Sequence, residues 1–374
     1  MKILQIGKTY PLIGGVDKVI FELSLGFSRN QIRCDVLCAS IDRKTHTIHQ
    51  NAFSTIYAIS SLGSIASTWI SPGMILKLRK IIQNYDIIHI HHPDPMAALA
   101  LLLCSNIKEK KIVLHWHSDI VKQKLLLKLY FPLQNWLLKR ADKIIATSPI
   151  YAENSIYLKP HLKKVEIIPI GVEVNHDLDI TLETKIKSNF AGKKIIYSLG
   201  RLCYYKGFEY LIDAAKYLDD SYVVLIGGGG PLKKDLALKI SQSDLQNKVF
   251  LLGRIDDKDM ATYFATSTIF CLPSIEKSEA FGIVQIEAMS FGKPIIATNI
   301  PESGVSWVNK HGDSGLNVEP KDAIGLAQAI MDICENEESL NKYSANSLKR
   351  FSDEFTVDRM TTKVLGLYKE LQLC

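Results

Sequence analysis

Two acidic residues in the carboxyl-terminal half could bind a hydroxyl-rich ligand. Glu279 and Glu287 lie in the segment PSIEKSEAFGIVQIEAMSFGKPIIAT, which follows an apolar run at Ile269–Pro273. The segment predicts a helix with Glu287 about two turns, or ~12 Å, along its axis. Carboxylate oxygens accept hydrogen bonds from hydroxyl groups, and the first N–H groups of a helix favour phosphate. The residues that open this helix and would present those groups are Phe281, Gly282 and Ile283.

Two cations and a pair of glycines could hold the phosphate of such a ligand. Arg201 and Lys206 follow the apolar run Lys194–Ser198 and come just before a predicted helix. Arginine can grip a diphosphate as a planar fork and lysine as a point charge. Gly14 and Gly15 come after the first apolar run, where a backbone without side chains can approach a ligand closely. The alternatives are solvated surface cations and an ordinary tight turn.

Histidines follow two strands predicted in the first half. His117 ends the run IVLHWH, where an imidazole could donate to a sugar hydroxyl or to a developing charge, and His115 is the second choice. The segment HIHHPDP could instead ligate a metal, although its spacing matches no recognised zinc pattern. Its candidate ligands are His89, His91, His92 and Asp94. The triplets Asp177–Asp179 and Asp257–Asp259 are interpreted as structural, since Asp caps helices well.

Short apolar runs alternate with longer helical patterns along the chain. The runs are rich in Ile and Val and do not alternate with polar residues, as is typical of strands buried on both faces of a parallel sheet. Repeated strand–helix units predict an α/β fold with doubly wound sheets. The predicted strands are Lys2–Ile6, Cys34–Cys38, Asp86–Ile90, Lys111–His115, Lys143–Thr147, Val165–Pro169, Lys194–Ser198, Tyr222–Ile226, Val249–Gly253, Ile269–Pro273, Pro294–Thr298 and Leu316–Val318.

The strand count restarts near residue 194, which indicates two sheets and two domains, 1–172 and 173–374. A last helix, about 355–374, could return to the amino-terminal domain. The polar stretch Gly171–Phe190 is interpreted as a linker. Ligands of open parallel sheets bind beyond the carboxyl ends of the strands, so the chemistry is expected in loops that follow strands in both domains.

Composition excludes wholesale disorder, with 47% hydrophobic and 22% charged residues in a chain of 374. Residues 1–172 carry 22 Lys and Arg against 11 Asp and Glu, whereas residues 173–374 carry 23 against 28, so the net charges are +11 and −5. The first half is therefore expected to face something anionic. Seven Cys without a CxxC pair suggest a reducing, cytoplasmic compartment, and neither a signal peptide nor a membrane span is predicted.

The segment 122–140 (KQKLLLKLYFPLQNWLLKR) has the pattern of a basic amphipathic helix. One predicted stripe is Lys124, Lys128, Asn135 and Lys139, and the other is Leu126, Tyr130, Leu133 and Leu137. Such a helix suits peripheral contact with an anionic membrane, and a core helix with a solvated basic edge is an equal alternative. Nucleic acid is not expected as a partner, because no nucleic-acid-binding motif accompanies the charge.

Three motifs together resemble one enzyme family. E-A-F-G-x-x-x-x-E-A from Glu279, G-R-x-x-x-x-K-G from Gly200, and G-G before the first helix are similar to those of the family-4 retaining glycosyltransferases, over about residues 1–350. The resemblance implies the GT-B fold, two Rossmann-like domains that face a central cleft. It also implies roles for single residues: Arg201 and Lys206 at the donor diphosphate, Glu279 and His117 at the donor sugar, Glu287 at the ribose, and Gly14 and Gly15 at phosphate and sugar. Leu202–Tyr205 depart from the commoner polar residues of the second motif.

The resemblance further implies transfer of a hexose from a nucleotide diphosphate sugar with retention of the anomeric configuration. Backbone of Val249–Ile255 is expected at the base, and no general base is assigned because the leaving phosphate itself accepts the proton. GDP-mannose is the expected donor and a UDP-hexose the alternative, with no further cofactor and no metal. The segment HHPDP is similar to that of bacterial mannosyl- and rhamnosyltransferases of surface polysaccharide synthesis. The expected acceptor is therefore an undecaprenyl-diphosphate-linked sugar of O-antigen or capsule assembly, at the inner face of the plasma membrane.

Two other classes of reaction stay open from the sequence. A metal-dependent hydrolase would use His89, His91 and His92 as ligands. The same fold could also carry out phosphorolysis or epimerisation of a sugar nucleotide. A requirement for an acceptor separates transfer from epimerisation, and bound metal separates the hydrolase from both.

Overall fold

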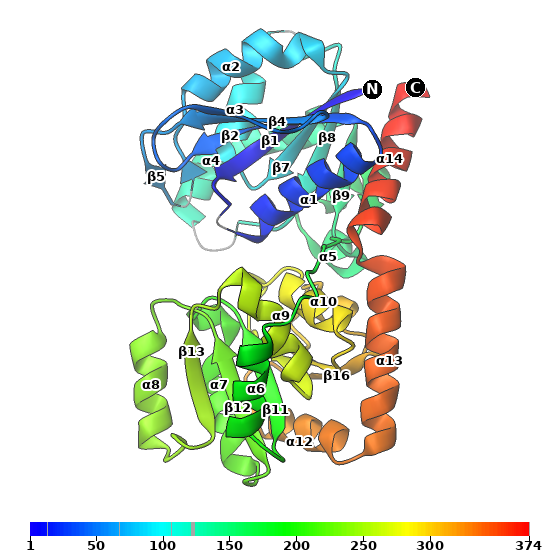
Figure 1. Ribbon diagram of the computed structural model, residues 1–374. Helices are drawn as coiled ribbons and strands as arrows, with labels where there is room; N and C mark the ends of the chain where they lie inside the picture. Colours follow the sequence, from blue (N-terminus) through cyan, green and yellow to red (C-terminus); the bar gives the residue numbers. More distant parts are fainter. Residues whose placement is uncertain (13, 67, 106, 121–123, 374) are drawn as a thin grey trace. The chain divides into compact units, whose positions relative to one another are not determined.

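The computed structural model describes residues 1–12, 14–66, 68–105, 107–120 and 124–373. The chain divides into two compact units (Figure 1). Unit 1 comprises Met1–Val172 and Thr356–Cys374, and unit 2 comprises Glu173–Phe355. The long carboxyl-terminal helical stretch is thus shared: α13 (Glu337–Glu354) belongs to unit 2 and α14 (Val357–Leu373) to unit 1.

Unit 1 is built on an eight-stranded sheet in the order β10-β9-β8-β7-β1-β2-β4-β3, in which only β3 runs antiparallel to its neighbour. Its strands are β1 (Lys2–Tyr10), β2 (Arg33–Ser40), β3 (His46–Asn51), β4 (Ser54–Ser60), β7 (Ile87–His92), β8 (Lys111–Trp116), β9 (Lys143–Ala146) and β10 (Val165–Ile167). Its helices besides α14 are α1 (Gly15–Arg29), α2 (Gly73–Ile81), α3 (Pro95–Leu102), α4 (Lys124–Arg140) and α5 (Pro149–Asn154), and β5 (Ser64–Ile65) pairs with β6 (Thr68–Trp69) in a separate ribbon.

The order of the strands places helices on both faces of this sheet. The chain moves one way across the sheet from β1 to β2 and the other way from β7 to β8. Since crossovers between parallel strands are right-handed, α1 and α3 lie on opposite faces. Helix α14 packs beside α1 (Figure 1). The reversal between β1 and β7 makes their carboxyl ends the place where a ligand is expected in this sheet.

Unit 2 has a six-stranded, wholly parallel sheet in the order β13-β12-β11-β14-β15-β16. Its strands are β11 (Lys194–Leu199), β12 (Tyr222–Gly227), β13 (Val249–Gly253), β14 (Ile269–Leu272), β15 (Ile295–Thr298) and β16 (Gly315–Val318). Its helices besides α13 are α6 (Ile180–Asn189), α7 (Phe208–Ala214), α8 (Lys233–Gln242), α9 (Asp257–Thr266), α10 (Ile283–Ser290), α11 (Val305–Val308) and α12 (Ala323–Cys334). Here the direction reverses between β11 and β14, so the loops after these two strands are the expected ligand-binding loops.

The predicted linker Gly171–Phe190 is wrong in its second half, because α6 occupies Ile180–Asn189. The side chain of Asp179 caps this helix by accepting a hydrogen bond from the Leu182 N–H at 2.9 Å. The helix buries only Ile186 fully, which explains why its apolar periodicity is weak in the sequence. The Asp177–Asp179 triplet therefore has a structural role, as interpreted from the sequence.

The basic helix predicted at 122–140 is observed as α4, although residues 122 and 123 lie outside the described residues. Tyr130 and Leu137 are buried, whereas Leu126, Leu129 and Phe131 are exposed, with Leu129 at 80%. Of the predicted stripe, Tyr130 and Leu137 are thus buried and Leu133 is half-buried, while Leu126 at its amino-terminal end is exposed. Helix α4 packs through Tyr130, Leu137 and Leu138, with Leu133 and Trp136 half-buried, and it leaves Leu126, Leu129 and Phe131 facing solvent.

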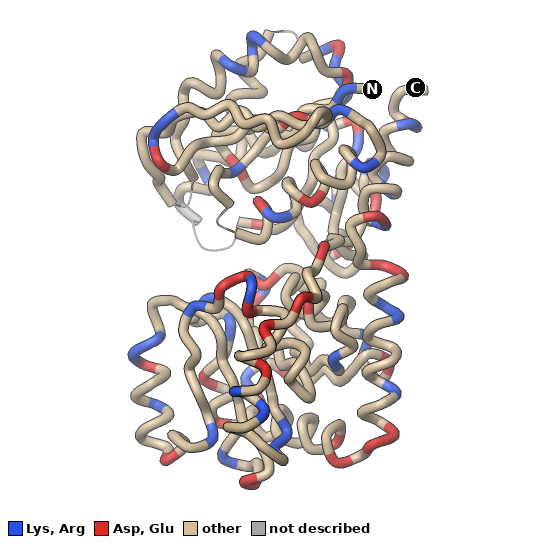
Figure 2. The backbone as a smooth tube through the Cα atoms, in the orientation of Figure 1, with Lys and Arg blue, Asp and Glu red and all other residues tan. Residues whose placement is uncertain are grey.

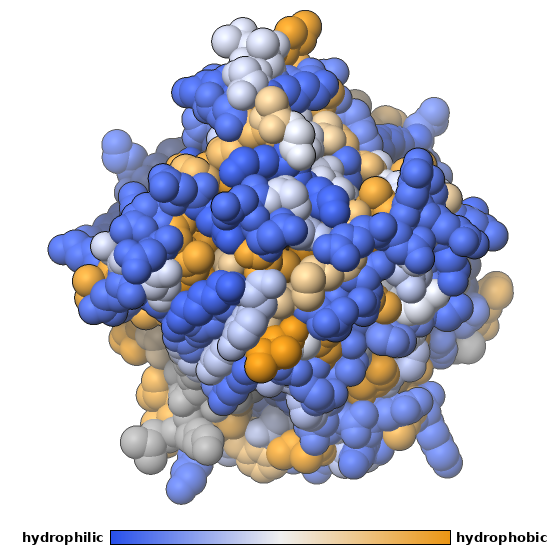
Figure 3. All heavy atoms as spheres, turned by 90° about the horizontal axis from the view of Figure 1, so that it is seen from below, coloured by the Kyte–Doolittle hydropathy of each residue, from blue (hydrophilic) through white to orange (hydrophobic). Residues whose placement is uncertain are grey.

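The surface of the described chain is largely hydrophilic where Figure 3 shows it, with small hydrophobic groups between charged ones. No helix among the described residues is long and apolar enough to span a bilayer. Figure 2 shows Lys and Arg spread over several elements of unit 1. By its sequence, α2 carries Lys77, Arg79 and Lys80. The positive charge of this unit is thus distributed and not confined to α4.

Candidate active site

The loop after β11 carries both predicted cations. Arg201 is exposed, whereas Lys206 is buried at the end of the short turn η3 (Tyr204–Lys206). Gly207 follows with φ of 64°, and a Cβ on it would lie 2.1 Å from the Pro273 carbonyl oxygen. Only glycine satisfies both the left-handed backbone and this close approach. The loop after β11 is thereby packed directly against the loop after β14.

This packing brings Lys206 to Glu279, which the sequence places far apart. The Lys206 Nζ lies 2.5 Å from the Glu279 Oε2, and the Ser274 hydroxyl donates to the same oxygen at 3.1 Å. The Ser303 hydroxyl donates to the Glu279 backbone carbonyl at 2.5 Å. Burial and, next, the Glu279 charge raise the pKa of the neighbouring Tyr205. Both the main chain and the carboxylate of Glu279 are therefore fixed at the carboxyl edge of the sheet.

Helix α10 starts a few residues further on, at the predicted position. Gly282 is its N-cap with φ of 74°, and a Cβ on Gly282 would lie 2.7 Å from the Leu272 Cδ2. The first N–H groups of the helix, from Ile283 onward, have no acceptor within the helix and can hold an anion. The Phe281 ring points elsewhere, packing against Trp307 and Phe355, so only its backbone can serve a ligand.

Glu287 is buried in the second turn of α10. It lies close enough to Tyr197 on β11 to raise the pKa of that phenol, after burial and Tyr263, which have the larger effects. The structure therefore puts Glu279 and Glu287 on successive parts of one loop and helix, both next to elements of the same sheet edge. This is the arrangement that the sequence predicted for the pair.

A run of four glycines, which begins at the last residue of β12, connects the loops at this edge of the sheet. The Gly200 N–H donates to the Gly227 carbonyl at 3.0 Å, and the Gly228 N–H donates to the Gly253 carbonyl at 2.7 Å. A Cβ on Gly227 would lie 2.9 Å from the Ile255 Cγ1, so Ile255 joins the same group of loops. The predicted residues of unit 2 thus gather at the carboxyl ends of β11, β13 and β14.

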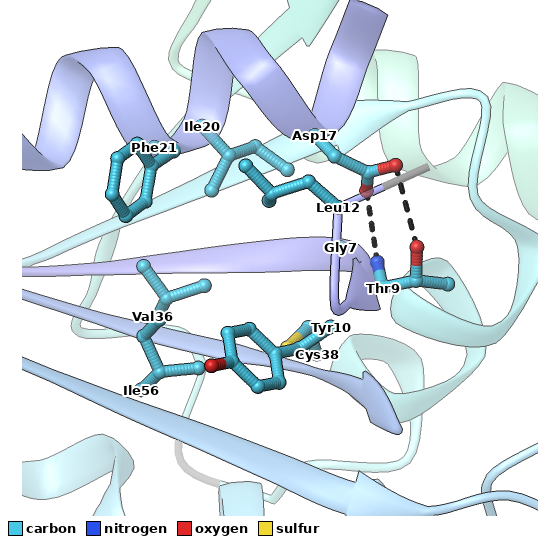
Figure 4. Close-up of a pocket in the computed structure, with 10 residues that line it drawn as sticks. All are labelled: Gly7, Thr9, Tyr10, Leu12, Asp17, Ile20, Phe21, Val36, Cys38 and Ile56. Atoms are coloured by element: carbon cyan, nitrogen blue, oxygen red, sulfur yellow. Dashed lines mark hydrogen bonds between the residues drawn. The ribbon is translucent and has the colours of Figure 1, made fainter. Parts of the chain in front are cut away.

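In unit 1 the predicted glycines lie in the loop after β1, which two carboxylates hold. Asp17 accepts hydrogen bonds from the Thr9 N–H at 2.9 Å and from the Gly14 N–H at 3.0 Å (Figure 4 shows Asp17 and Thr9). Asp94 accepts from the Lys8 N–H at 2.6 Å. Gly14 is the extended N-cap of α1, which begins at Gly15. The pocket in Figure 4 beneath this loop measures only about 20 Å³, which is room for one water and not for a substrate.

His117 directly follows β8 and is buried, next to three other histidines. Its ring stacks with those of His91 on β7 and His115 on β8, and these two stack in turn with His89 on β7, with ring centroids 4.1–5.3 Å apart. His92 lies on the other face of the sheet, where its ring stacks on Trp116 at 3.7 Å. Successive residues of a strand point to opposite faces, so the triad of His89, His91 and His92 expected for a metal-dependent hydrolase is wrong.

A different trio, His89, His91 and His115, offers nitrogens that lie within 4.8 Å of one another. Five of their six nitrogens are already in use, because His89 and His91 both bond through both ring nitrogens and the His115 Nδ1 bonds to His89, while the His115 Nε2 has no hydrogen-bond partner among the described residues. Asp94, the fourth expected ligand, accepts from the Met96 and Ala97 N–H groups as the N-cap of α3. These contacts fit hydrogen-bonded imidazoles better than metal ligands.

Burial keeps these histidines neutral. It lowers the pKa of His89, His91, His92 and His117 well below the ordinary value, and it lowers the pKa of His115 to about 3. Each ring therefore carries one proton at pH 7, and each is a donor at one nitrogen and an acceptor at the other.

Sequence reasoning missed the residues that orient the site. Ser274 and Ser303 hold Glu279, and Asp17 shapes the glycine loop by accepting a hydrogen bond from the Gly14 N–H. Asp17 does leave a signal, because an acidic residue three positions after the N-cap is typical of a capping box. The serines leave none, since their partners come together only in the folded sheet.

Two doubly wound sheets, one with a buried cation and carboxylate beside an anion-binding helix start, define a glycosyltransferase of the GT-B fold. Family models agree: residues 13–176 match Glycosyltransferase Family 4, and residues 179–350 match Glycosyl transferases group 1. The chain belongs to the family-4 glycosyltransferases, which are retaining enzymes, and its motifs resemble those of bacterial mannosyl- and rhamnosyltransferases of surface polysaccharide synthesis.

Two relatives align over nearly the whole chain. The O-antigen chain mannosyltransferase C of Escherichia coli is 36% identical, with 99% of each chain covered. The D-rhamnosyltransferase WbpZ of Pseudomonas aeruginosa is 32% identical, with 95% of this chain and 92% of that one covered. Among solved structures, sucrose-phosphate synthase from Thermosynechococcus elongatus has a TM-score of 0.81 at 19% identity, with all of both chains covered. Anabaena HepE in complex with UDP has a TM-score of 0.77 at 20% identity, with 99% of this chain and 100% of that one covered.

Proposed function

We propose that this glycosyltransferase moves mannose from GDP-mannose to a sugar acceptor carried on undecaprenyl diphosphate, in the assembly of O-antigen or capsule. The observation that carries the proposal is the 36% identity, over 99% of both chains, to an O-antigen chain mannosyltransferase. The second relative transfers D-rhamnose, which is mannose without one hydroxyl group, so both relatives support a donor of this shape. A UDP-hexose is the alternative, supported by the UDP bound to the structural neighbour HepE.

In the proposed reaction, unit 2 holds the nucleotide and the leaving diphosphate. Arg201, Lys206 and the first N–H groups of α10 stabilise the negative charge that builds up as the glycosidic bond breaks. Donors already aimed at a developing charge usually supply the largest catalytic effect. Glu287 binds the ribose, and the backbone at Ile255 contacts the base.

The remaining roles concern the sugar. Glu279 accepts hydrogen bonds from sugar hydroxyls and is held ready for this by Lys206 and Ser274. His117 contributes from unit 1, and Gly14 and Gly15 allow the backbone to approach the phosphate and sugar. The leaving phosphate takes the proton of the acceptor hydroxyl, so no side chain acts as general base.

A donor screen followed by a transfer assay tests the proposal. GDP-mannose, GDP-D-rhamnose, UDP-glucose and UDP-N-acetylglucosamine are compared by thermal stabilisation and then with lipid-linked acceptors, with the anomeric configuration of the product read by NMR. We expect GDP-mannose to stabilise the protein most and to be transferred with retention. If none of the four shifts the melting temperature or is transferred, the proposed function is wrong.

Glu279→Gln tests the site itself. We expect it to lower kcat by ~10²–10³ while nucleotide affinity changes little, because a neutral amide binds hydroxyls without matching a developing positive charge on the sugar. Glu302→Gln is the matched control, since Glu302 is an exposed carboxylate that pairs with Lys277 at 2.8 Å in the same unit. Equal activities of the two variants would refute the assignment of Glu279.

Membrane contact is the second part of the proposal. Helix α4 exposes Leu126, Leu129 and Phe131 together with Lys128, and exposed apolar side chains next to a cation suit the headgroup region of an anionic bilayer. Flotation with phosphatidylglycerol vesicles tests it. We expect Leu129→Glu with Phe131→Glu to abolish binding and Leu238→Glu, at an exposed leucine of unit 2, to leave it intact. Equal binding by all three proteins, or none by the wild type, would refute it.

A further inference from the structure

A row of hydrogen bonds links the sheet interior of unit 1 to His117. The Gln5 Oε1 lies 2.9 Å from the His91 Nε2, and the His91 Nδ1 lies 2.9 Å from the His117 Nε2. Gln5, on β1, and His91 are fully buried, and His117 is 5% exposed. Nothing in the expected chemistry of the family-4 site requires Gln5 or His91, so the row calls for its own explanation.

The direction of the row is fixed at Gln5. The Gln5 Nε2 donates to the Ile20 carbonyl at 2.9 Å and approaches the Cys34 Sγ at 3.4 Å. A carbonyl oxygen accepts only, so turning the amide over would set two acceptors against each other. The Gln5 Oε1 therefore faces His91 and must accept a hydrogen bond from the His91 Nε2–H.

The proton positions of both histidines follow from that one constraint. A neutral imidazole with its proton on Nε2 is an acceptor at Nδ1, so His91 accepts from the Nε2–H of His117. His117 then carries its own proton on Nε2 as well, and its Nδ1 keeps a lone pair. That Nδ1 is buried and has no hydrogen-bond partner among the described residues. A buried acceptor left without a donor is costly, which indicates a place for one.

We propose that Gln5 and His91 are positioning residues that lock His117 in its Nε2–H tautomer, so that the His117 Nδ1 accepts a hydrogen bond from a hydroxyl of the bound sugar. The tautomer itself follows from contacts within unit 1, and the identity of the donor hydroxyl rests on the proposed function. An acceptor nitrogen attracts hydroxyl groups and repels phosphate oxygens. His117 therefore acts on the sugar and not on the diphosphate, which Lys206 and Arg201 serve.

The same cluster contains a matched control. A second row joins the Tyr368 hydroxyl to the His89 Nδ1 and the His89 Nε2 to the His115 Nδ1, the latter at 3.2 Å. Both rows are buried and stack on each other, but only the first ends at His117. Tyr368→Phe therefore removes a buried hydrogen bond from the cluster without touching the Gln5 row.

Nitrogen NMR of the full chain labelled with ¹⁵N-histidine reads the tautomer directly, with His117→Gln used to assign the signals. We expect an unprotonated Nδ1 and a protonated Nε2 on His117 in the free protein. On titration with GDP-mannose, or with UDP-glucose if that is the donor used, the Nδ1 signal should shift towards the range of a hydrogen-bonded acceptor. A protonated Nδ1 in the free wild type would overturn the proposal, and so would an Nδ1 signal that a productive donor leaves unmoved.

Variants test the lock. Gln5→Met keeps the side-chain length but removes the Oε1, so His91 can turn its proton towards His117 and reverse the row. We expect a second His117 tautomer to appear and kcat to fall about tenfold, with KM for the donor rising less, while Tyr368→Phe shows the wild-type tautomer and rate. Gln5→Glu, whose protonated acid can donate to Ile20 and accept from His91, should restore the tautomer. Equal effects of Gln5→Met and Tyr368→Phe on the His117 signals would refute the lock. A protein that uses no sugar nucleotide would refute the proposed function, while the tautomer stays readable in the free protein.

Discussion

The ion pair of Lys206 and Glu279 should stabilise the fold through its balance of charge, whereas in catalysis each partner should have a role of its own. The two contributions can be separated with Lys206→Met, Glu279→Gln and the double variant. The side chains of Lys206 and Glu279 are only 11% and 12% exposed, and their charged atoms are 2.5 Å apart. Lys206→Met therefore leaves a nearly buried carboxylate that still accepts a hydrogen bond from the Ser274 hydroxyl.

The size of each effect follows from this environment. Removing one partner of a buried ion pair typically costs 3–5 kcal/mol, and the Ser274 hydrogen bond and residual exposure place Lys206→Met at the lower end, about 3 kcal/mol. The double variant removes both charges and keeps the Ser274 contact, so it should lose only about 1 kcal/mol. Catalysis behaves differently, because the cation that faces the leaving diphosphate is missing from both. Lys206→Met should lose about 10²–10³ in kcat, and the double variant, which also lacks the Glu279 carboxylate, should lose at least as much.

Hydrogen exchange of the β11 and β14 amides reports the stability of unit 2 by itself, and initial rates with saturating donor report kcat. We expect the double variant to regain about 2 kcal/mol of the stability lost by Lys206→Met and none of its activity. Recovered activity in the double variant would refute the catalytic roles of both Lys206 and Glu279, since neither charge would then be needed for transfer. Additive losses of stability would show that the two charges do not interact.

Three further outcomes are expected. Gly282→Ala should weaken nucleotide binding, measured by calorimetry, at least tenfold. It should also destabilise unit 2 by about 1–2 kcal/mol, because the left-handed backbone is strained with a Cβ and the Cβ crowds Leu272. Gly192→Ala is the control: its φ is 72° and the space around its Cβ position is open, so it should show the backbone strain alone and bind nucleotide as the wild type does. Lys293 donates to the Ala265 and Ser267 carbonyls, and burial lowers its pKa to about 8. Between about pH 8 and pH 10 the unfolded chain keeps the Lys293 proton that the folded chain has released, so raising the pH favours the folded state. The free energy of unfolding of the wild type, measured relative to that of Lys293→Met by denaturant titration, should therefore rise across this window. A relative free energy that falls with pH would contradict this. Treatment with EDTA should leave the transfer rate unchanged, and a loss of transfer would show that a metal ion takes part in the reaction.

Much of the fold could be predicted because buried parallel strands have a strong signature. The two sheets follow from runs such as Tyr222–Ile226, which reappears within β12. Strand β3 (His46–Asn51) was missed because its sequence HTIHQN is polar and its side chains alternate between partly buried and exposed, as on an edge strand. Helix α6 was missed for a related reason, since it rests on the sheet through little apolar surface. Strand β4 (Ser54–Ser60) was also missed although most of its residues are buried, because Ser and Thr interrupt its apolar run.

The candidate site shows a similar division between residues that the sequence predicts and contacts that it does not. Residues whose role depends on local chain geometry were predicted, such as Gly282 at a helix start and Lys206 after a strand. The pairing of Lys206 with Glu279 was not, because it depends on the approach of two loops that Gly207 permits. His92 was grouped wrongly with His89 and His91 because spacing in the sequence was weighed without the alternation of a strand.

The order of strands explains why chemistry gathers where it does in each unit. In unit 2 the sheet reverses between β11 and β14, and the loops after these strands carry Lys206 and Glu279. In unit 1 the reversal falls between β1 and β7, and the loops there are joined by the bond from the Lys8 N–H to Asp94. Helices on opposite faces diverge at such a point and leave the strand ends uncovered, so polar side chains can collect there without breaking the core. The hydrogen-bonded row from Gln5 lies at the same reversal, because β1, β7 and β8 are neighbours in the sheet. Gln5, His91 and His117, on or directly after these strands, are enough to fix the proton position of a histidine at the sheet edge from a contact in the core.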